Sequence, residues 1–342
     1  MNSFFEMLKK IYPNILEDMQ QRYKVLHCIG LYQPIGRRTL AEATGLTERV
    51  ARREVEFLQD QGLLFVTSKG MQLSKEGTLL LEQLANVLQD ITGKSVLEKR
   101  IREMLHIDHV MIISGNSDQD DWVKYEMGKA CVAYLKKIVQ PGFTLAVTGG
   151  TTMAAVAEAM TPFDDNHRYL FVPARGGIGE KVESQANTIA AEMAKRAHAS
   201  YRMLFVPDLI SEKTYETMIT EPAISEVLDQ IKSADVVLHG VGDALTMAHR
   251  RRTPEASVTK LIEDGAVGEA FGYYFDEKGT VIHKVKTVGL QLEDLTSKKH
   301  VVTVAGGKSK GQAIISYFKN GKSDVLITDE AAAEQILRDV SL

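Results

Sequence analysis

The chain has 342 residues, of which 44% are hydrophobic, 25% charged and 7% aromatic. This balance is that of a globular protein and excludes disordered, collagenous and coiled-coil classes, and at about 150 residues per domain the length predicts two domains. The net charge of −4, from 41 basic and 45 acidic residues, argues against a polyanionic partner unless basic residues are gathered locally.

Nothing in the sequence predicts a membrane-spanning segment, a disulfide framework or a bound metal. No stretch approaches the roughly 18 consecutive apolar residues of a membrane helix, and the first residues, MNSFFEMLKKIYP, lack the pattern of a secretory signal. Cys28 and Cys131 lie far apart without a CxxC pattern, and the histidines are scattered singly. We therefore expect a reducing, cytoplasmic location, and neither a metal nor a cofactor.

The chain begins with two helical segments separated by helix-breaking residues. Apolar residues at helical spacing predict a first helix over residues 20–31, and the sequence PIG at 34–36 then breaks it. Thr39 lies three residues before Glu42, which is the spacing of a capping box. This spacing predicts that Thr39 is the N-cap of a short second helix that ends at Gly45.

A third helix is predicted to begin after Thr47 and to carry a cluster of arginines. Val50, Glu54 and Leu58 follow one ridge of this helix, so its three arginines fall on or beside the outward face. A recognition helix presents arginine on that face to base edges and phosphates in the major groove. Two short apolar runs around Lys69-Gly70 follow, which predicts the hairpin of a winged helix-turn-helix. We expect these residues to contact DNA: Arg37, Arg38, Thr47, Arg49, Arg52, Arg53 and Lys69.

The local charge supports this interpretation. Residues 37–53 contain five arginines against two acidic residues. A local basic stripe can bind phosphates despite a neutral surrounding, because such contacts are screened beyond about 10 Å. The alternative is a solvated, arginine-rich face on a helical hairpin. The preceding helix, the glycine turn and the hairpin together favour DNA binding.

A connector follows the hairpin. From residue 77 to 105 apolar residues recur at helical spacing, with an interruption at Thr92-Gly93. An apolar seam of this kind is typical of a helix that packs against a partner chain. Palindromic operators match the two-fold symmetry of a dimer. We therefore predict a DNA-binding domain over residues 1–90, a helical connector over 91–108, and an effector-binding and oligomerisation domain over 109–342.

From residue 109 onward, short apolar strands alternate with amphipathic helices. This pattern is typical of a doubly wound, mostly parallel sheet covered by helices on both faces, so the predicted fold class is α/β. Ligands of such sheets bind beyond the carboxyl ends of the strands. The expected strands lie within residues 109–114, 143–150, 169–177, 203–207, 236–242, 301–307 and 324–329.

Glycines and polar side chains follow four of these strands. One strand leads through Thr148-Gly149-Gly150 into a helix that begins at Thr151-Thr152, an arrangement suited to a phosphate at a helix N-terminus. Four such ends at one edge of a sheet predict a small anionic ligand. The lack of GxGxxG and GxxxxGK[ST] argues against a dinucleotide and a nucleoside triphosphate. The other three ends carry Arg175 before Gly176-Gly177, Arg250 to Arg252 after Gly240 to Asp243, and Lys308 to Lys310 after Gly306-Gly307.

Two further polar residues complete the predicted binding set, because a sugar presents hydroxyl groups as well as phosphates. Gln185 lies near the start of the helix that follows the Arg175 strand, and Glu269 lies between two glycines in GAVGEAFGYYF. The alternative for each is a local structural role, as a surface glutamine and as a strand glutamate paired with a neighbour.

The joint order of a winged helix-turn-helix, TGGTT, ARGG, GVGD and AGGKSKG resembles the SorC/DeoR-type bacterial transcriptional regulators over nearly the whole chain. The resemblance implies an effector domain similar to sugar-phosphate isomerases and deaminases, repression of a glycolytic operon, and fructose-1,6-bisphosphate as effector. It also implies homo-oligomers, a dimer and a tetramer on operator DNA, that are loosened or rearranged by the effector. The effector contacts that it implies are Gly149, Gly150, Thr151, Thr152, Arg175, Gln185, Arg250, Glu269 and Lys310, of which the first four and Lys310 would hold one phosphate.

The sequence departs from the related enzymes at the point where their catalytic acids stand. Asp243 after GVG is followed by Ala244-Leu245-Thr246, without a second acid beside it. General acid and base catalysis needs such groups within hydrogen-bond reach of the transferred proton. We therefore expect binding without turnover and no catalytic residue. The alternatives are a residual isomerase or deaminase, and a regulator that senses a different phosphorylated metabolite.

Overall fold

The computed structural model describes residues 7–8, 10–91, 94–163, 168–177, 181–207 and 211–339. The chain forms two compact units, over residues 1–97 and 98–342. Each unit has its own hydrophobic core.

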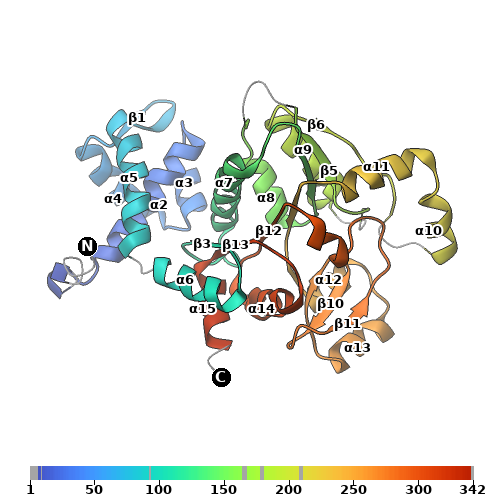
Figure 1. Ribbon diagram of the computed structural model, residues 1–342. Coiled ribbons are helices and arrows are strands. Elements are labelled where there is room, and N and C mark those ends of the chain that lie inside the picture. Colours follow the sequence, from blue (N-terminus) through green and yellow to red (C-terminus); the bar gives the residue numbers. More distant parts are fainter. Residues whose placement is uncertain are drawn as a thin grey trace. The chain divides into compact units, whose positions relative to one another are not determined.

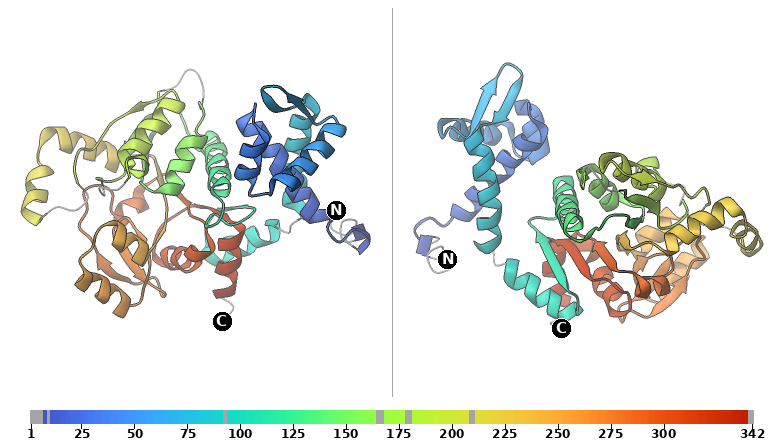
Figure 2. Two further views of the ribbon diagram at one scale, coloured as in Figure 1. Left: turned by 180° about the vertical axis from the view of Figure 1, so that it is seen from behind. Right: turned by 45° about the horizontal axis from the view of Figure 1, so that its top comes forward.

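The N-terminal unit is a winged helix-turn-helix, as predicted. Helices α2 (Ile15–Tyr32), α3 (Arg37–Thr44) and α4 (Glu48–Asp60) pack around a core that includes Leu26, Leu40 and Leu58, all of which are buried. The hairpin of β1 (Leu64–Thr67) and β2 (Gly70–Leu73) pairs Thr67 with Gly70 at its tip and extends from the helices (Figure 2). The first helix starts earlier than the predicted residue 20.

The two predicted N-caps have different outcomes. Thr47 is the N-cap of α4, and its hydroxyl accepts a hydrogen bond from the Val50 N–H at 3.3 Å. Thr39 is not a cap, because α3 begins at Arg37 with Gly36 as its N-cap. The prediction failed because the same spacing of threonine and glutamate also occurs inside a helix. There the backbone N–H groups already donate to carbonyl groups, so none is free to donate to the threonine hydroxyl. Gly45 ends α3 as predicted, in the left-handed conformation that glycine favours, with φ at 66°.

The connector consists of helical segments on either side of the expected interruption. Helix α5 spans Lys75–Ile91 and α6 spans Lys94–Leu105. Thr92 and Gly93 lie outside the described residues. In α6, Ile101 is fully buried and the Glu98 carboxylate accepts a hydrogen bond from the Ile112 N–H at 2.9 Å.

The C-terminal unit is built on a seven-stranded parallel sheet with the order β3-β13-β12-β7-β4-β5-β6 (Figure 1). Val236, Val237 and Leu238 are fully buried, because helices cover both faces of the sheet. Apolar and polar residues therefore do not alternate along this strand. The strands are β3 (His109–Ile113), β4 (Thr144–Val147), β5 (Leu170–Pro173), β6 (Ser200–Tyr201), β7 (Val236–His239), β12 (His300–Val304) and β13 (Val325–Asp329).

Helices α7 (Asp121–Ile138), α8 (Thr151–Ala159) and α9 (Ala186–Arg196) share one core with one face of this sheet. Helices α14 (Gly311–Asn320) and α15 (Glu330–Asp339) lie on the other side (Figure 1). The remaining helices are α10 (Glu212–Met218), α11 (Pro222–Lys232), α12 (Ala244–Arg250) and α13 (Glu255–Glu263). Among the described residues, the short 3-10 helices are η1 (Val182–Ser184), η2 (Leu292–Ser297) and η3 (Lys308–Lys310).

Two features of this unit differ from the sequence prediction. The apolar run at 203–207 forms no strand, and the neighbouring strand is the short β6. A second, antiparallel sheet was not predicted; it has the order β11-β10-β9-β8. Its strands are β8 (Gly242–Asp243), β9 (Ala266–Ala270), β10 (Tyr273–Asp276) and β11 (Val281–Lys284). These strands are only two to five residues long, and such short strands give weak periodicity signals, which is why the sequence pattern did not predict this sheet.

Candidate functional site

A cavity of about 270 Å³ lies at the carboxyl ends of two adjacent central strands, β4 and β7. From β4 the chain adds β5 and β6 on one side, and from β7 it adds β12 and β13 on the other. The connections therefore leave the sheet in opposite directions at this point, which opens a crevice in a doubly wound fold. This volume is slightly below the usual range of ligand pockets, about 300–1,000 Å³, and suits a small ligand.

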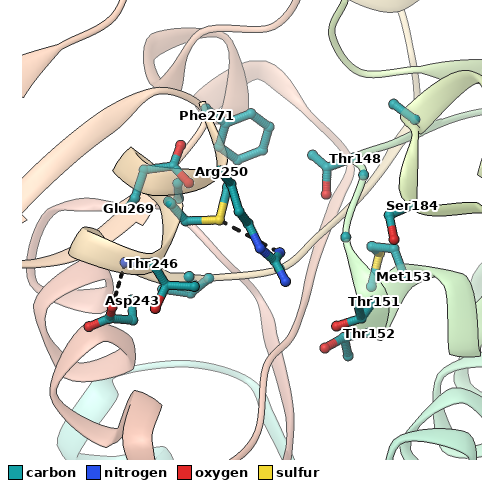
Figure 3. Close-up of a pocket in the computed structure, with 18 of the residues that line it drawn as sticks. Thr148, Thr151, Thr152, Met153, Ser184, Asp243, Thr246, Arg250, Glu269 and Phe271 are labelled. Carbon is teal, nitrogen blue, oxygen red and sulfur yellow. Dashed lines mark hydrogen bonds between the residues drawn. The ribbon is translucent and has the colours of Figure 1, made fainter. Parts of the chain in front are cut away.

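The loop after β4 brings backbone N–H groups to this cavity. The first N–H groups of a helix have no partner within it, and α8 has no side-chain cap at Gly150. Gly149 is required for close approach, because a Cβ atom there would lie 2.6 Å from the Ser184 carbonyl oxygen. Gly150 has φ at 117°, which side chains rarely adopt. Thr151 and Thr152 add hydroxyl groups at the same rim (Figure 3).

A buried ionic cluster forms the opposite part of the cavity. The Glu269 carboxylate lies 2.8 Å from Arg251 Nη2 and 3.6 Å from Arg175 Nη1, and accepts a hydrogen bond from the Gly272 N–H at 2.6 Å. Burial alone would raise the pKa of Glu269, but Arg251 and Arg175 hold it below the usual range of a glutamate. Glu269 therefore stays charged and holds both arginines in place. Removing these arginines would leave a buried carboxylate without a counter-charge, which is energetically costly.

Lys310 lies at the rim of the same cavity, in the turn before α14. Its ammonium group makes no hydrogen bond or ion pair within 4 Å to any described side chain. Burial lowers its pKa, and Asp118 offsets part of this shift. Asp118 also accepts hydrogen bonds from the Ser309 N–H and hydroxyl at 2.9 and 3.0 Å. The buried Asp329 accepts from Ser117 and Gly307, both at 2.7 Å, and so ties the loops that carry Asp118 and Lys310.

The structure brings all nine predicted effector residues to one cavity. Arg250, at the end of α12, points toward the threonines of α8 across the cavity (Figure 3). Gln185 is the N-cap residue of α9. The predicted residues that line the cavity are Gly149, Gly150, Thr151, Thr152, Arg175, Gln185, Arg250, Glu269 and Lys310.

Sequence reasoning missed several residues of this cavity. Asp118 follows β3 in the sequence SGNSD, which has the same glycine-and-polar pattern as the four recognised strand ends and could have been found by it. Arg251 stood in a run of three arginines, and only the structure shows that it is buried against Glu269 and donates to the Tyr274 hydroxyl at 3.1 Å. Thr148 also lines the cavity, and its buried hydroxyl finds no partner among the described residues.

The charges of the cavity favour an anion. Four cations and three carboxylates line it, and all three carboxylates are engaged by the protein itself. Asp118 accepts from Ser309, Glu269 pairs with two arginines, and Asp243 caps α12 by accepting from the Thr246 N–H at 2.8 Å. The open helix N-terminus and Lys310 remain to bind a phosphate. Among the described residues, no group of histidines, cysteines or acids could hold a metal ion.

The predicted DNA-contacting residues lie on the surface of the N-terminal unit. All seven are exposed: Arg37, Arg38, Thr47, Arg49, Arg52, Arg53 and Lys69. Arg38 and Arg52 form helical ion pairs with Glu42 and Glu56 at 3.2 and 2.8 Å. Such exposed pairs contribute little, about 0.3–0.5 kcal/mol, so they do not prevent a phosphate contact. Within the described residues, Arg49 has no acidic partner.

Comparison with known families matches both units. A model described as the CggR N-terminal DNA binding domain matches residues 19–88, and one described as a putative sugar-binding domain matches residues 89–338. Together with the fold and the cavity, these matches define a transcriptional regulator with a DNA-binding and a sugar-binding domain. No described helix has the length and apolar character needed to cross a membrane.

Full-length relatives narrow the class. The chain is 51% identical over 340 residues to the central glycolytic genes regulator of Priestia megaterium and 49% identical over 339 residues to that of Bacillus subtilis, covering at least 99% of each chain. A SorC family regulator structure from Enterococcus faecalis has 44% identity and a TM-score of 0.67, covering 70% of this chain and 99% of that one. The chain belongs to the SorC family of transcriptional regulators, in the group of the central glycolytic genes regulators. It is therefore a regulator and not an enzyme, so the isomerase or deaminase alternative is wrong.

Proposed function

We propose that this protein is a cytoplasmic repressor of a glycolytic operon that fructose-1,6-bisphosphate releases or rearranges on its operator. The arginine face of α3 and α4 contacts the operator, and the cavity between β4 and β7 binds the sugar bisphosphate. The names of the full-length relatives support the glycolytic target.

The observation that carries the effector proposal is the chemistry of the cavity. Lys310 and Arg250, which points across the cavity toward α8, form one set of groups together with the open N-terminus of that helix, and the buried cluster of Arg175, Arg251 and Glu269 forms the second. Phosphate oxygens accept from the first set, while Gln185 and Glu269 offer hydrogen bonds to sugar hydroxyls. A ligand with a phosphate and several hydroxyl groups uses both sets.

Regulation requires that the ligand bind two arrangements of the protein with different affinity. Couplings of this kind are typically about 1–3 kcal/mol. We propose a dimer that forms a tetramer on the operator, because two-fold symmetric operators pair with two-fold symmetric proteins. The effector then changes the association between the sugar-binding domains and so the affinity for DNA.

The test is a titration of the full-length protein on the DNA upstream of its own gene, with and without fructose-1,6-bisphosphate. We expect tight, salt-dependent binding that the bisphosphate alters in the wild type but not in Arg175→Ala or Lys310→Ala. Lys308→Ala is the matched control, because Lys308 is an exposed lysine of the same turn that does not line the cavity. DNA binding that stays unchanged at millimolar bisphosphate removes this effector and favours another phosphorylated metabolite.

A further inference from the structure

A buried carboxylate lies in the middle of the arginine-rich helix. Glu54 is 3% exposed, although it belongs to α4, whose other face carries Arg49 and Arg52. An acidic residue at this place opposes phosphate binding by its charge. A buried carboxylate is also costly unless several donors satisfy it. The presence of Glu54 therefore indicates that this side chain has a structural role and does not bind DNA.

Three donors from two helices surround this carboxylate. Gln21 and Arg22 of α2 donate to Glu54 at 3.0 and 3.1 Å. Arg53 of α4 donates from Nε and Nη2 to the same carboxylate at 3.1 and 2.8 Å. Burial would raise the pKa of Glu54, but Arg53 and Arg22 lower it, so the group stays charged. All the donors that it needs are supplied within the N-terminal unit.

Arg22 holds α4 at a second point. Its guanidinium carbon lies 3.8 Å from the centre of the Phe57 ring, one helical turn beyond Glu54. Ala51, Val55 and Leu58 are the apolar residues that α4 buries. The contacts of Arg22 with Glu54 and Phe57 fix the rotation of the helix about its own axis, because they act at its side. That rotation decides where Arg49 and Arg52 point.

We propose that Glu54 is a positioning residue that sets the rotation of α4 on α2, and that Arg53 acts through Glu54 and not through DNA. This inference rests on the proposed DNA-binding function, and it replaces the sequence-based expectation that Arg53 contacts DNA. The Arg52–Glu56 pair differs, because both of its members are exposed, at 66% and 55%. Arg52 is therefore free to exchange its carboxylate for a phosphate, whereas Arg53 is held by a carboxylate that cannot move into solvent.

The salt dependence of DNA binding separates these two roles. A side chain that neutralises one phosphate contributes about −0.9 to the slope of log K against log salt concentration, and a positioning residue contributes nothing to it. We would measure the affinity of the full-length protein for the DNA upstream of its own gene between about 50 and 200 mM KCl. A duplex of the same length and composition with scrambled sequence gives the specificity ratio.

We expect Arg52→Ala to make the slope less negative by about 0.9. Arg53→Ala should leave the slope unchanged and should weaken specific binding by a similar factor at every salt concentration. Glu54→Gln keeps the volume but loses the charge, so specific binding should fall at least tenfold and scrambled-duplex binding less than threefold. The double variant of Arg53→Ala and Glu54→Gln should lose no more than Glu54→Gln alone, because both act through one contact.

Two results would overturn the inference. One is a reduced slope for Arg53→Ala that equals the change for Arg52→Ala, because Arg53 would then contact a phosphate. The other is an unchanged specificity ratio for a folded Glu54→Gln. If that variant does not fold, Arg53→Ala alone decides, because Arg53 is exposed. Equal binding of the wild type to operator and scrambled duplex would instead overturn the proposed repressor function, and this inference with it.

Discussion

The two units use arginine in opposite ways. In the N-terminal unit the side chains of Arg38 and Arg52 are 84% and 66% exposed, whereas in the sugar-binding unit those of Arg175 and Arg251 are 6% and 0% exposed. An exposed arginine keeps its hydration even when it forms a weak helical ion pair, so it can exchange that partner for a phosphate, and salt weakens both interactions. A buried arginine needs a carboxylate of its own chain, here Glu269. We propose that the first kind contacts DNA, whereas the second kind forms part of the wall of a cavity.

This difference predicts which substitutions unfold the protein and which only weaken binding. Removing a buried partner leaves an uncompensated charge, while removing an exposed arginine leaves the fold intact.

Glu269→Gln should destabilise the sugar-binding unit by about 3–5 kcal/mol, because Arg175 and Arg251 would stay buried without a counter-charge. Trp122, the only tryptophan of the chain, lies in α7 of this unit, so its fluorescence during urea unfolding reports the loss. Glu263→Gln, an exposed position in α13, is the control and should change stability by less than about 0.5 kcal/mol. Equal stability of the two variants would mean that the cluster contributes nothing.

Arg49→Ala should weaken operator binding by about 1–3 kcal/mol and leave stability unchanged, because Arg49 is exposed in the first turn of α4. Fluorescence anisotropy with labelled operator DNA measures the change. Arg338→Ala removes another exposed arginine, from α15 of the other unit, and this variant should bind DNA as the wild type does. A loss of the same size in both variants would show that only net charge matters.

Effector affinity should fall at alkaline pH because of Lys310. Burial lowers the pKa of Lys310 in the free protein, and a bound phosphate favours the ammonium form, so binding raises that pKa. Above the free-protein pKa, binding takes up a proton, and affinity should fall by up to about tenfold per pH unit, which is about 1.4 kcal/mol. Below that pKa, affinity should not depend on this group.

Calorimetric titrations with fructose-1,6-bisphosphate in buffers of increasing pH measure this dependence. The second pKa of a phosphate is about 6, so the ligand charge is constant over the alkaline range. Lys310→Arg stays protonated and should give a flat profile. A profile of the wild type that is equally flat would show that Lys310 does not contact the phosphate.

The smallest effect concerns the two threonines that the sequence predicted as caps. Thr47→Ala should destabilise α4 by about 1 kcal/mol, because its hydroxyl accepts from the Val50 N–H. Thr39→Ala should change the stability of α3 by less than about 0.5 kcal/mol, because Thr39 lies inside that helix. Amide hydrogen exchange of α3 and α4 measures both changes. A larger loss of stability in Thr39→Ala would indicate that Thr39 does cap α3.

Much of the fold was predictable because its signals are local. Helical spacing, the cap at Thr47, the turn at Gly45 and the continuous apolar strands depend on residues close in sequence, and each was found. The false cap at Thr39 and the false strand at 203–207 show the limit of such signals. A short motif is compatible with several environments, and packing selects among them.

By itself, the sequence determined the order of the two units, the arginine-rich third helix and nine of the residues that line the cavity, because charge patterns and glycines at strand ends can be recognised from residues close in sequence. Only the tertiary structure decided that β4 and β7 are neighbours, which brings residues 149–152 next to Arg250 and Lys310. It also decided that Arg251 is paired inside the protein and that Glu54 is buried between two helices. The reason is physical: the cost of burying a charge depends on partners that lie far away in the sequence, and only the folded chain brings them together.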